Sequence, residues 1–134
     1  MPVIKRREDR DTLRKAATSG APCYFLGTDS APHPVAKKLR TVGAAGVFNA
    51  PVAIESYAQV FAEEGALDKL EAFASLYGPA HYRLPPNAET ITLERAGWTA
   101  PKDIRIEGPE ERALVHRGGE AIPWKVAAQG AASE

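Results

Sequence analysis

Asp29 and His33 are the residues of this sequence whose types and spacing best suit chemistry. Asp29 follows the apolar run Cys23-Tyr24-Phe25-Leu26, and an imidazole comes four residues later. In a parallel α/β sheet, the carboxyl ends of the strands line the active site. A carboxylate placed there can bind a metal or move a proton. The pattern therefore predicts a candidate catalytic site around Asp29.

Both residues also have a purely structural interpretation. An aspartate after a strand often caps a helix or closes an Asx turn. A single histidine is often satisfied by local hydrogen bonds. On spacing alone, these alternatives stay open beside the catalytic one.

Length and composition describe an ordinary globular chain. Its 134 residues and 14.4 kDa predict one domain, and they are too few for a complete (β/α)₈ barrel of about 250 residues. A hydrophobic fraction of 44% and a charged fraction of 25% argue against disorder and coiled coil. Because 17 basic and 17 acidic residues give zero formal net charge, a nucleic-acid partner is disfavoured.

Several features predict a cytoplasmic protein without a membrane partner. No apolar run approaches the roughly 18 residues of a membrane span. The first ten residues are charged, unlike a secretory signal. Cys23 is the single cysteine, which excludes an internal disulfide and fits a reducing compartment. The short basic stretches 5–7 and 37–40 are the sole basis for a nucleic-acid role, and a solvated helix start with interleaved acids explains 5–7 as well.

A helix, a strand and a long loop must position Asp29. Acids in the first turns and Gly20 as a stop predict a helix over 7–19. The apolar run 23–26 predicts a buried parallel strand. Since one parallel strand needs neighbours for its backbone hydrogen bonds, part of the fold must come from elsewhere. Residues 30–52, rich in proline and glycine, predict a long irregular segment.

Two further helices and several short strands follow. Apolar periodicity predicts helices over 53–64 and 67–77 with aromatic core residues, the second helix stopping at Gly78-Pro79. Gly118-Gly119 predicts the turn of a hairpin between the last two strands. Residues 127–134 predict a frayed tail. The predicted strands lie within 89–95, 103–106, 113–116 and 121–126.

The stretch Phe25-Leu26-Gly27-Thr28-Asp29-Ser30-Ala31-Pro32-His33 resembles the last barrel strand of bacterial single-chain (class II) dihydroorotase, a metal-dependent amidohydrolase. Companion motifs follow in order over about residues 2–126. The resemblance implies an α/β fold: the C-terminal part of a TIM-like (β/α)₈ barrel, incomplete as a barrel, with 1–126 as one domain portion. The companion motifs are Pro2-Val3-Ile4-Lys5-Arg6, Ala16-Ala17-Thr18-Ser19-Gly20, Gly43-Ala44-Ala45-Gly46-Val47-Phe48-Asn49-Ala50-Pro51, Ser56-Tyr57-Ala58, Leu70-Glu71-Ala72-Phe73, Tyr77-Gly78-Pro79, Gly119-Glu120 and Pro123-Trp124.

The resemblance also implies a reaction and roles for particular residues. The family cyclises N-carbamoyl-L-aspartate reversibly to L-dihydroorotate in pyrimidine biosynthesis, with two zinc ions. Zinc lowers the pKa of a bound water, giving a hydroxide that can attack the ring amide. By resemblance, Asp29 is the general base and a zinc ligand, and His33 binds the substrate carboxylate. Ala45 would contact the substrate through its backbone, and Met1 lies where the family has a substrate-contacting leucine.

Most of the family's metal site has no counterpart in these 134 residues. The family's other ligands, a His-x-His pair, a carboxylated lysine and two further histidines, belong to the first two-thirds of its chain. Because a catalytic zinc usually needs three protein ligands, we expect the isolated chain to be inactive. Pro34-Val35-Ala36-Lys37-Lys38, Ala44 and Val47 depart from the family pattern, which affects the fine substrate contacts.

Two other hypotheses stand beside the dihydroorotase fragment. In one, the chain is half of a split enzyme, and a complementing N-terminal chain pairs with the exposed edges of strand 23–26. In the other, it is a non-catalytic interaction module, although such a module has no need of Asp29 and His33. A homodimer is a further candidate assembly.

Overall fold

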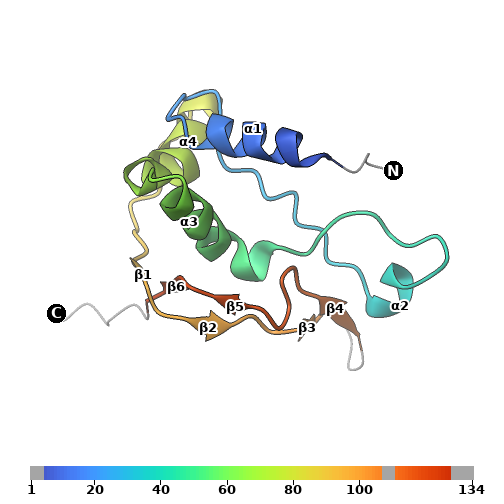
Figure 1. The fold of residues 1–134 in the computed structure, drawn as a ribbon. Coiled ribbons are helices and arrows are strands. Elements are labelled where there is room, and N and C mark those ends of the chain that lie inside the picture. The colour runs from blue at the N-terminus through green and yellow to red at the C-terminus, as the bar shows by residue number, and fades with distance from the viewer. Residues whose placement is uncertain (1–4, 107–110, 128–134) are drawn as a thin grey trace.

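The computed structural model describes residues 5–106 and 111–127. Figure 1 shows α1, α3 and α4 on one side and a ribbon of short strands on the other, with α2 beside β4. The helices are α1 (Arg7–Ala17), α2 (Val35–Lys38), η1 (Ala50–Val52), α3 (Ala53–Glu63), η2 (Leu67–Lys69), η3 (Ala72–Leu76) and α4 (Tyr77–Tyr82). The strands are β1 (Leu93–Glu94), β2 (Trp98–Thr99), β3 (Asp103–Arg105), β4 (Arg112–Leu114), β5 (Ala121–Ile122) and β6 (Lys125–Val126). Within these ranges, no helix has the length and apolarity to cross a membrane.

The first predicted helix is confirmed as α1. Glu8 and Asp9 occupy its first turn and Arg14 and Lys15 its last, an arrangement that the helix dipole favours. Gly20 follows the helix with φ 85°, a left-handed conformation that glycine adopts without the penalty of a Cβ atom.

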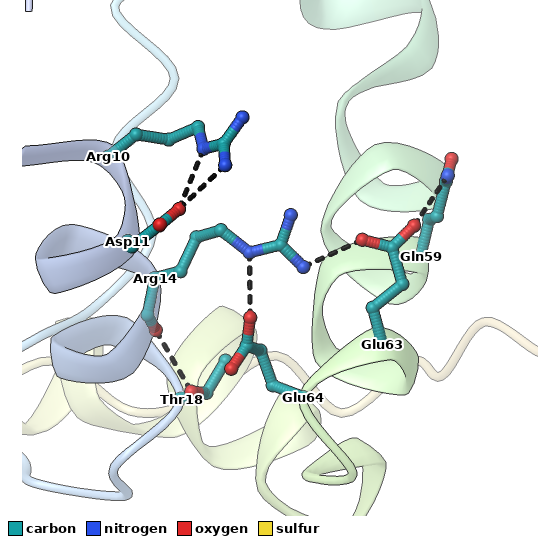
Figure 2. Close-up of polar contacts among 7 residues, drawn as sticks. All are labelled: Arg10, Asp11, Arg14, Thr18, Gln59, Glu63 and Glu64. Atoms are coloured by element: carbon teal, nitrogen blue, oxygen red, sulfur yellow. Dashed lines mark hydrogen bonds and ion pairs between the residues drawn. The ribbon is translucent and has the colours of Figure 1, made fainter. Parts of the chain in front are cut away.

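Arg14 links α1 to α3. Its Nη2 donates to Glu63 Oε2 at 2.6 Å and its Nε donates to Glu64 Oε1 at 2.8 Å (Figure 2). Gln59 Nε2 donates to the other oxygen of Glu63 at 2.8 Å. The hydrogen bond from Arg14, with the one from Gln59, lowers the pKa of the Glu63 carboxyl. The hydrogen bond to Glu63 in turn raises the pKa of Arg14.

A helical core forms between α3 and the helical segment that follows it. Phe61 of α3 and Phe73 of η3 are buried, and their ring centroids lie 5.2 Å apart. Tyr57 packs against Phe73 at 5.4 Å. Core packing was the expected role of these aromatic residues, and the structure confirms it. The buried members of this cluster are Ala58, Phe61, Ala66, Leu70 and Phe73.

The segment after α3 stays helical to Tyr82, so the predicted stop at Gly78-Pro79 is wrong. The chain passes from a 3-10 turn through a π-helical stretch into α4. Pro79 is the third residue of α4 and follows directly on the π-helical stretch Ala72–Leu76. Gly78 lies beside the Phe25 ring, and a Cβ at this position would be 3.4 Å from it, an ordinary van der Waals contact. The helix ends at Arg83, which adopts a left-handed conformation with φ 56°.

The predicted strand over 23–26 is also wrong. The Leu26 N–H donates to the Phe73 carbonyl at 3.0 Å, so this segment binds to the helical core. A strand requires a ladder of backbone hydrogen bonds to a neighbour. In 5–106 and 111–127 the paired strands are all antiparallel and belong to the C-terminal ribbon. The apolar run therefore lacks the parallel neighbours that would make it a strand.

The C-terminal strands form one interrupted antiparallel ribbon. β1 pairs with β6, β2 with β5 and β3 with β4, so the pairs are nested along the chain. The predicted turn at Gly118-Gly119 exists, but it lies within the returning limb. The Gly119 N–H donates to the Ala100 carbonyl at 2.9 Å, across to the other limb. The predicted hairpin between 113–116 and 121–126 is therefore wrong.

A second small core attaches this ribbon to the beginning of α3. Val52, Ala100, Val115 and Ile122 are buried together. They come from η1 and from both limbs of the ribbon, so this core fixes the ribbon against the segment that precedes α3. Of the predicted tail 127–134, residues 128–134 lie outside the described residues.

We expect Phe61→Ala to be strongly destabilising. Phe61 is 0% exposed and packs in the helical core, so its removal leaves a cavity that costs about 3–5 kcal/mol of unfolding free energy. Urea denaturation measures this change. Leu84→Ala is the control, because Leu84 is 62% exposed and its truncation should cost less than about 0.5 kcal/mol. Equal effects of the two variants would contradict this account of the core.

We expect the Arg14–Glu63 ion pair to make stability depend on acid pH. Because the pKa of Glu63 is lowered in the folded chain, the pair stabilises fully above the unfolded pKa of about 4.3. This contribution disappears as pH falls through the folded pKa. It is at most about 1 kcal/mol, since Glu63 is 45% exposed and solvent screens the pair.

Urea unfolding at pH 7 and pH 3 checks this dependence. Arg14→Met should lose less unfolding free energy between the two pH values than the wild type does. Arg10→Met is the control, because Arg10 pairs only with its exposed neighbour Asp11 in the contacts above. A wild-type pH dependence in Arg14→Met would show that this ion pair does not contribute.

Candidate functional site

Asp29 lies at an exposed point of the chain between residues 23–26 and α2. Its φ of 43° is in the left-handed region, which residues other than glycine adopt rarely. Such conformations persist where the surrounding structure fixes them, and they cluster at functional sites. The contacts of the residues on either side of Asp29 show what fixes this one.

Three hydrogen bonds and one parallel bridge join residues 28–31 to residues 47–50, and we call this contact the seam. The bridge pairs Ser30 with Val47. Because the contacts lie on both sides of Asp29, they hold the backbone from which its carboxylate projects. The hydrogen bonds run from the Ala31 N–H to the Val47 carbonyl (2.9 Å), from Asn49 Nδ2 to the Thr28 carbonyl (2.8 Å) and from the Ala50 N–H to Ser30 Oγ (3.0 Å).

Gly46 allows the two sides of the seam to approach closely. Its φ is 98°, and a Cβ at this position would lie 2.6 Å from the Ala31 Cβ. Any other residue would therefore need both a strained backbone and a displacement of Ala31.

The strand ribbon contacts the chain on both sides of the seam. Pro34 forms an antiparallel bridge with Ala113 of β4, just after His33. The His116 N–H donates to the Phe48 carbonyl at 2.8 Å, next to the seam. His33 itself is half-buried between the seam and α2 along the chain. The ribbon thus holds both segments that carry the predicted substrate residues.

Ala45 lies in the loop 43–47, which ends at the seam, and its side chain is exposed. Lys38 of α2 reaches this loop: its Nζ donates to the Ala44 carbonyl at 2.8 Å and also to the Gly46 carbonyl. The structure therefore brings together the backbone segments of Asp29, His33 and Ala45. Met1 lies outside the described residues.

The residues present do not make a complete metal centre. Within 5–106 and 111–127, no group of three or more His, Cys, Asp or Glu side chains could hold a metal ion. A catalytic zinc needs about three protein ligands, so the described residues do not hold one by themselves. His81 packs against the Phe25 and Tyr82 rings, at 5.2 Å and 4.9 Å between centroids, which is a structural role.

Sequence reasoning missed the residues that hold the site, namely Asn49 and Lys38. Asn49 binds the Thr28 carbonyl, and its Oδ1 is buried with no partner among the described residues. A polar amide between Phe48 and the Ala50-Pro51 turn was the available signal. In the sequence, Lys38 stands out only as a member of the basic stretch 37–40, and its hydrogen bonds to the Ala44 and Gly46 carbonyls depend on the position of the loop.

The chain is similar to dihydroorotases over nearly its whole length. No family model matches it. The dihydroorotase of Parasynechococcus marenigrum is 53% identical over 126 residues, which are 94% of this chain and 35% of that protein. The crystal structure of dihydroorotase from Saccharomyces cerevisiae in complex with 5-fluoroorotic acid has a TM-score of 0.85 and 36% identity, covering 94% of this chain and 36% of that one.

A crystal structure of the Campylobacter jejuni dihydroorotase has a TM-score of 0.78 and 30% identity, and it is matched over 95% of this chain and 36% of its own. The chain thus spans about 35% of the length of the relatives it matches. The predicted resemblance to about one third of the length of a dihydroorotase is confirmed. So is the predicted incomplete barrel, because residues 5–106 and 111–127 form helices and two-stranded pairs without a closed sheet.

We expect Gly46→Ala to open the seam. The left-handed φ and the contact with Ala31 together cost about 1–3 kcal/mol. Thermal unfolding measures the loss of stability, and hydrogen exchange of the Ala31 amide locates it. Gly97→Ala is the matched control: nothing lies within 4 Å of its added Cβ, so it should be neutral or stabilising by about 0.4–1 kcal/mol. Unchanged exchange at Ala31 in Gly46→Ala would refute this role.

Proposed function

We propose that this chain forms one third of a dihydroorotase, a cyclic amidohydrolase of pyrimidine biosynthesis that interconverts N-carbamoyl-L-aspartate and L-dihydroorotate. The observation that carries the proposal is the similarity to dihydroorotases over 94% of the chain, in sequence and in structure. The candidate site lies within the matched region. The non-catalytic module has no comparable observation in its favour.

Asp29 is the general base in this proposal. Its carboxylate is exposed, and the seam fixes the backbone that carries it. In the hydrolytic direction, water attacks the ring amide carbonyl, and a carboxylate oxygen of Asp29 accepts the proton that the water loses. The C–N bond then breaks, and Asp29 returns the proton to the leaving nitrogen. The cyclisation uses the same steps in reverse.

His33 and Ala45 are the proposed substrate-binding residues. The imidazole N–H of His33 donates a hydrogen bond to the substrate carboxylate, whose negative charge makes the bond charge-assisted. The backbone of Ala45 binds the substrate from the other side of the seam. The yeast relative was crystallised with 5-fluoroorotic acid, which is a cyclic pyrimidine carboxylate, and this supports the same chemical class here. The role of Met1 stays a prediction from the resemblance.

The two zinc ions of the family supply, when bound, an activated water and a polarised carbonyl. In this proposal Asp29 supplies one ligand, and the described residues hold no group of three or more His, Cys, Asp or Glu side chains that would supply the rest. We propose that the other ligands and the missing strands come from residues outside these 134, on the same polypeptide or on a complementing chain. A homodimer is a candidate assembly of the completed enzyme. The exposed thiol of Cys23 fits a cytoplasmic location.

A chimeric enzyme tests the proposal. Residues 1–127 of this chain replace the matched third of the Parasynechococcus marenigrum dihydroorotase. We expect the zinc-loaded chimera to hydrolyse dihydroorotate, and the 134-residue chain alone to be inactive. Asp29→Asn should lower kcat of the chimera by about 10²–10⁴-fold, because the amide cannot accept the proton.

Asp68→Asn is the matched control, because Asp68 is exposed in η2, away from the seam in the chain. It should leave kcat unchanged. A folded chimera without activity would overturn the assignment to this enzyme. An Asp29→Asn chimera as active as the control would overturn the role of Asp29 alone.

A further inference from the structure

We propose that Lys38 is a positioning residue of this site: its ammonium group sets the conformation of loop 43–47 so that the Ala45 N–H points toward the substrate. This proposal rests on the proposed function and adds a residue for which neither the motif nor the comparisons give a role. It assigns Lys38 to binding rather than to proton transfer.

The ammonium group binds the two carbonyls that flank Ala45. Lys38 Nζ donates to the Ala44 carbonyl at 2.8 Å and to the Gly46 carbonyl. An ammonium carries three N–H donors, and its hydrogen bonds to carbonyl oxygens are charge-assisted. One side chain therefore holds the 44–45 peptide unit, which ends at the Ala45 N–H, and the 46–47 peptide unit, which follows Gly46. The half-burial of Lys38 strengthens these bonds by partly excluding water.

The direction of the Ala45 N–H follows from peptide geometry. The Ala44 carbonyl and the Ala45 N–H belong to the same peptide unit, which is planar and trans. In a trans unit these two groups point in opposite directions. Because the carbonyl points at Lys38 Nζ, the Ala45 N–H points away from it. The positive charge also polarises the peptide unit, which makes this N–H a better donor to an acceptor oxygen of the substrate.

The rest of the loop is built to keep this arrangement. The Ala44 N–H donates to the Lys37 carbonyl at 3.3 Å, which ties the loop to the end of α2. A Cβ on Gly43 would lie 2.6 Å from the Lys38 carbonyl, so the loop passes directly over the helix end. At its other end the loop enters the seam through Val47. Lys38 thus connects the position of Ala45 to α2, which begins two residues after His33.

Hydrogen exchange of the full 134-residue chain tests the role in the loop. We expect the Ala44 amide to exchange about tenfold faster in Lys38→Met than in the wild type, because the loop opens when the charge-assisted bonds are lost. The Phe61 amide in α3 should be unaffected. Lys37→Met is the matched control, since Lys37 is an exposed neighbour on the same short helix.

Kinetics of the chimeric enzyme test the role in binding. Lys38→Met should raise KM for dihydroorotate about tenfold and leave kcat within about threefold, because a lost binding donor weakens ground state and transition state alike. Lys38→Arg, which keeps the charge and several donors, should restore most of the wild-type KM. Lys37→Met should leave both constants unchanged.

The outcomes separate this proposal from the proposed function. Unchanged Ala44 exchange in Lys38→Met overturns the role of Lys38, whatever the chimera does. A fall in kcat at constant KM overturns the binding role as well. An inactive chimera with Lys38 intact overturns the proposed function and the substrate role with it. If the Phe61 amide also exchanges faster in Lys38→Met, that variant is destabilised as a whole, and Lys38→Arg is used instead. A Lys38→Arg variant that exchanges like the wild type but has a KM as high as that of Lys38→Met overturns the proposal.

Discussion

The seam between residues 28–31 and 47–50 is the contact on which the candidate site depends. Each of its hydrogen bonds has a backbone group on at least one side, so it constrains the main chain directly rather than through side-chain packing. It holds Asp29 in a conformation that an isolated peptide would rarely adopt. It also connects the segment that carries the carboxylate to the loop that carries Ala45. Without it, the proposed base and the proposed binding loop have no fixed relation to each other.

Each of the two segments that form the seam is attached to one of the two small cores. The helical core around Phe61 and Phe73 holds the segment before Asp29, through the hydrogen bond from Leu26 to Phe73. The second core holds the strand ribbon against η1, immediately after the other side of the seam. The seam therefore bridges two apolar clusters, and a displacement of either cluster would move one side of it. Away from the seam, Arg14 joins α1 to the end of α3 (Figure 2).

Local signals in the sequence were sufficient for the elements that depend on local energetics. The helices α1 and α3 follow from charge placement and apolar periodicity, and the structure has both nearly as predicted. Segment 23–26 carries an equally clear apolar signal, but strand formation depends on partners that can be far away in sequence. The hairpin prediction failed for the same reason: Gly118-Gly119 is a genuine turn, yet the limb after it pairs with residues before 106. Apolar periodicity indicates which residues will be buried, but it does not show which segments of the chain they pair or pack with.

The same distinction explains which residues of the candidate site could be predicted from the sequence and which could not. The motif around Asp29 was visible because the residues that give its chemistry are contiguous. Asn49 and Lys38 were not visible, because an amide and a lysine acquire a role only when a carbonyl elsewhere in the chain lies within reach. A metal centre is a still stronger case, since it needs ligands from several strands at once. This chain can therefore hold the proposed base and the proposed binding loop in place through its own contacts, whereas its described residues do not bring together the ligands of a metal centre.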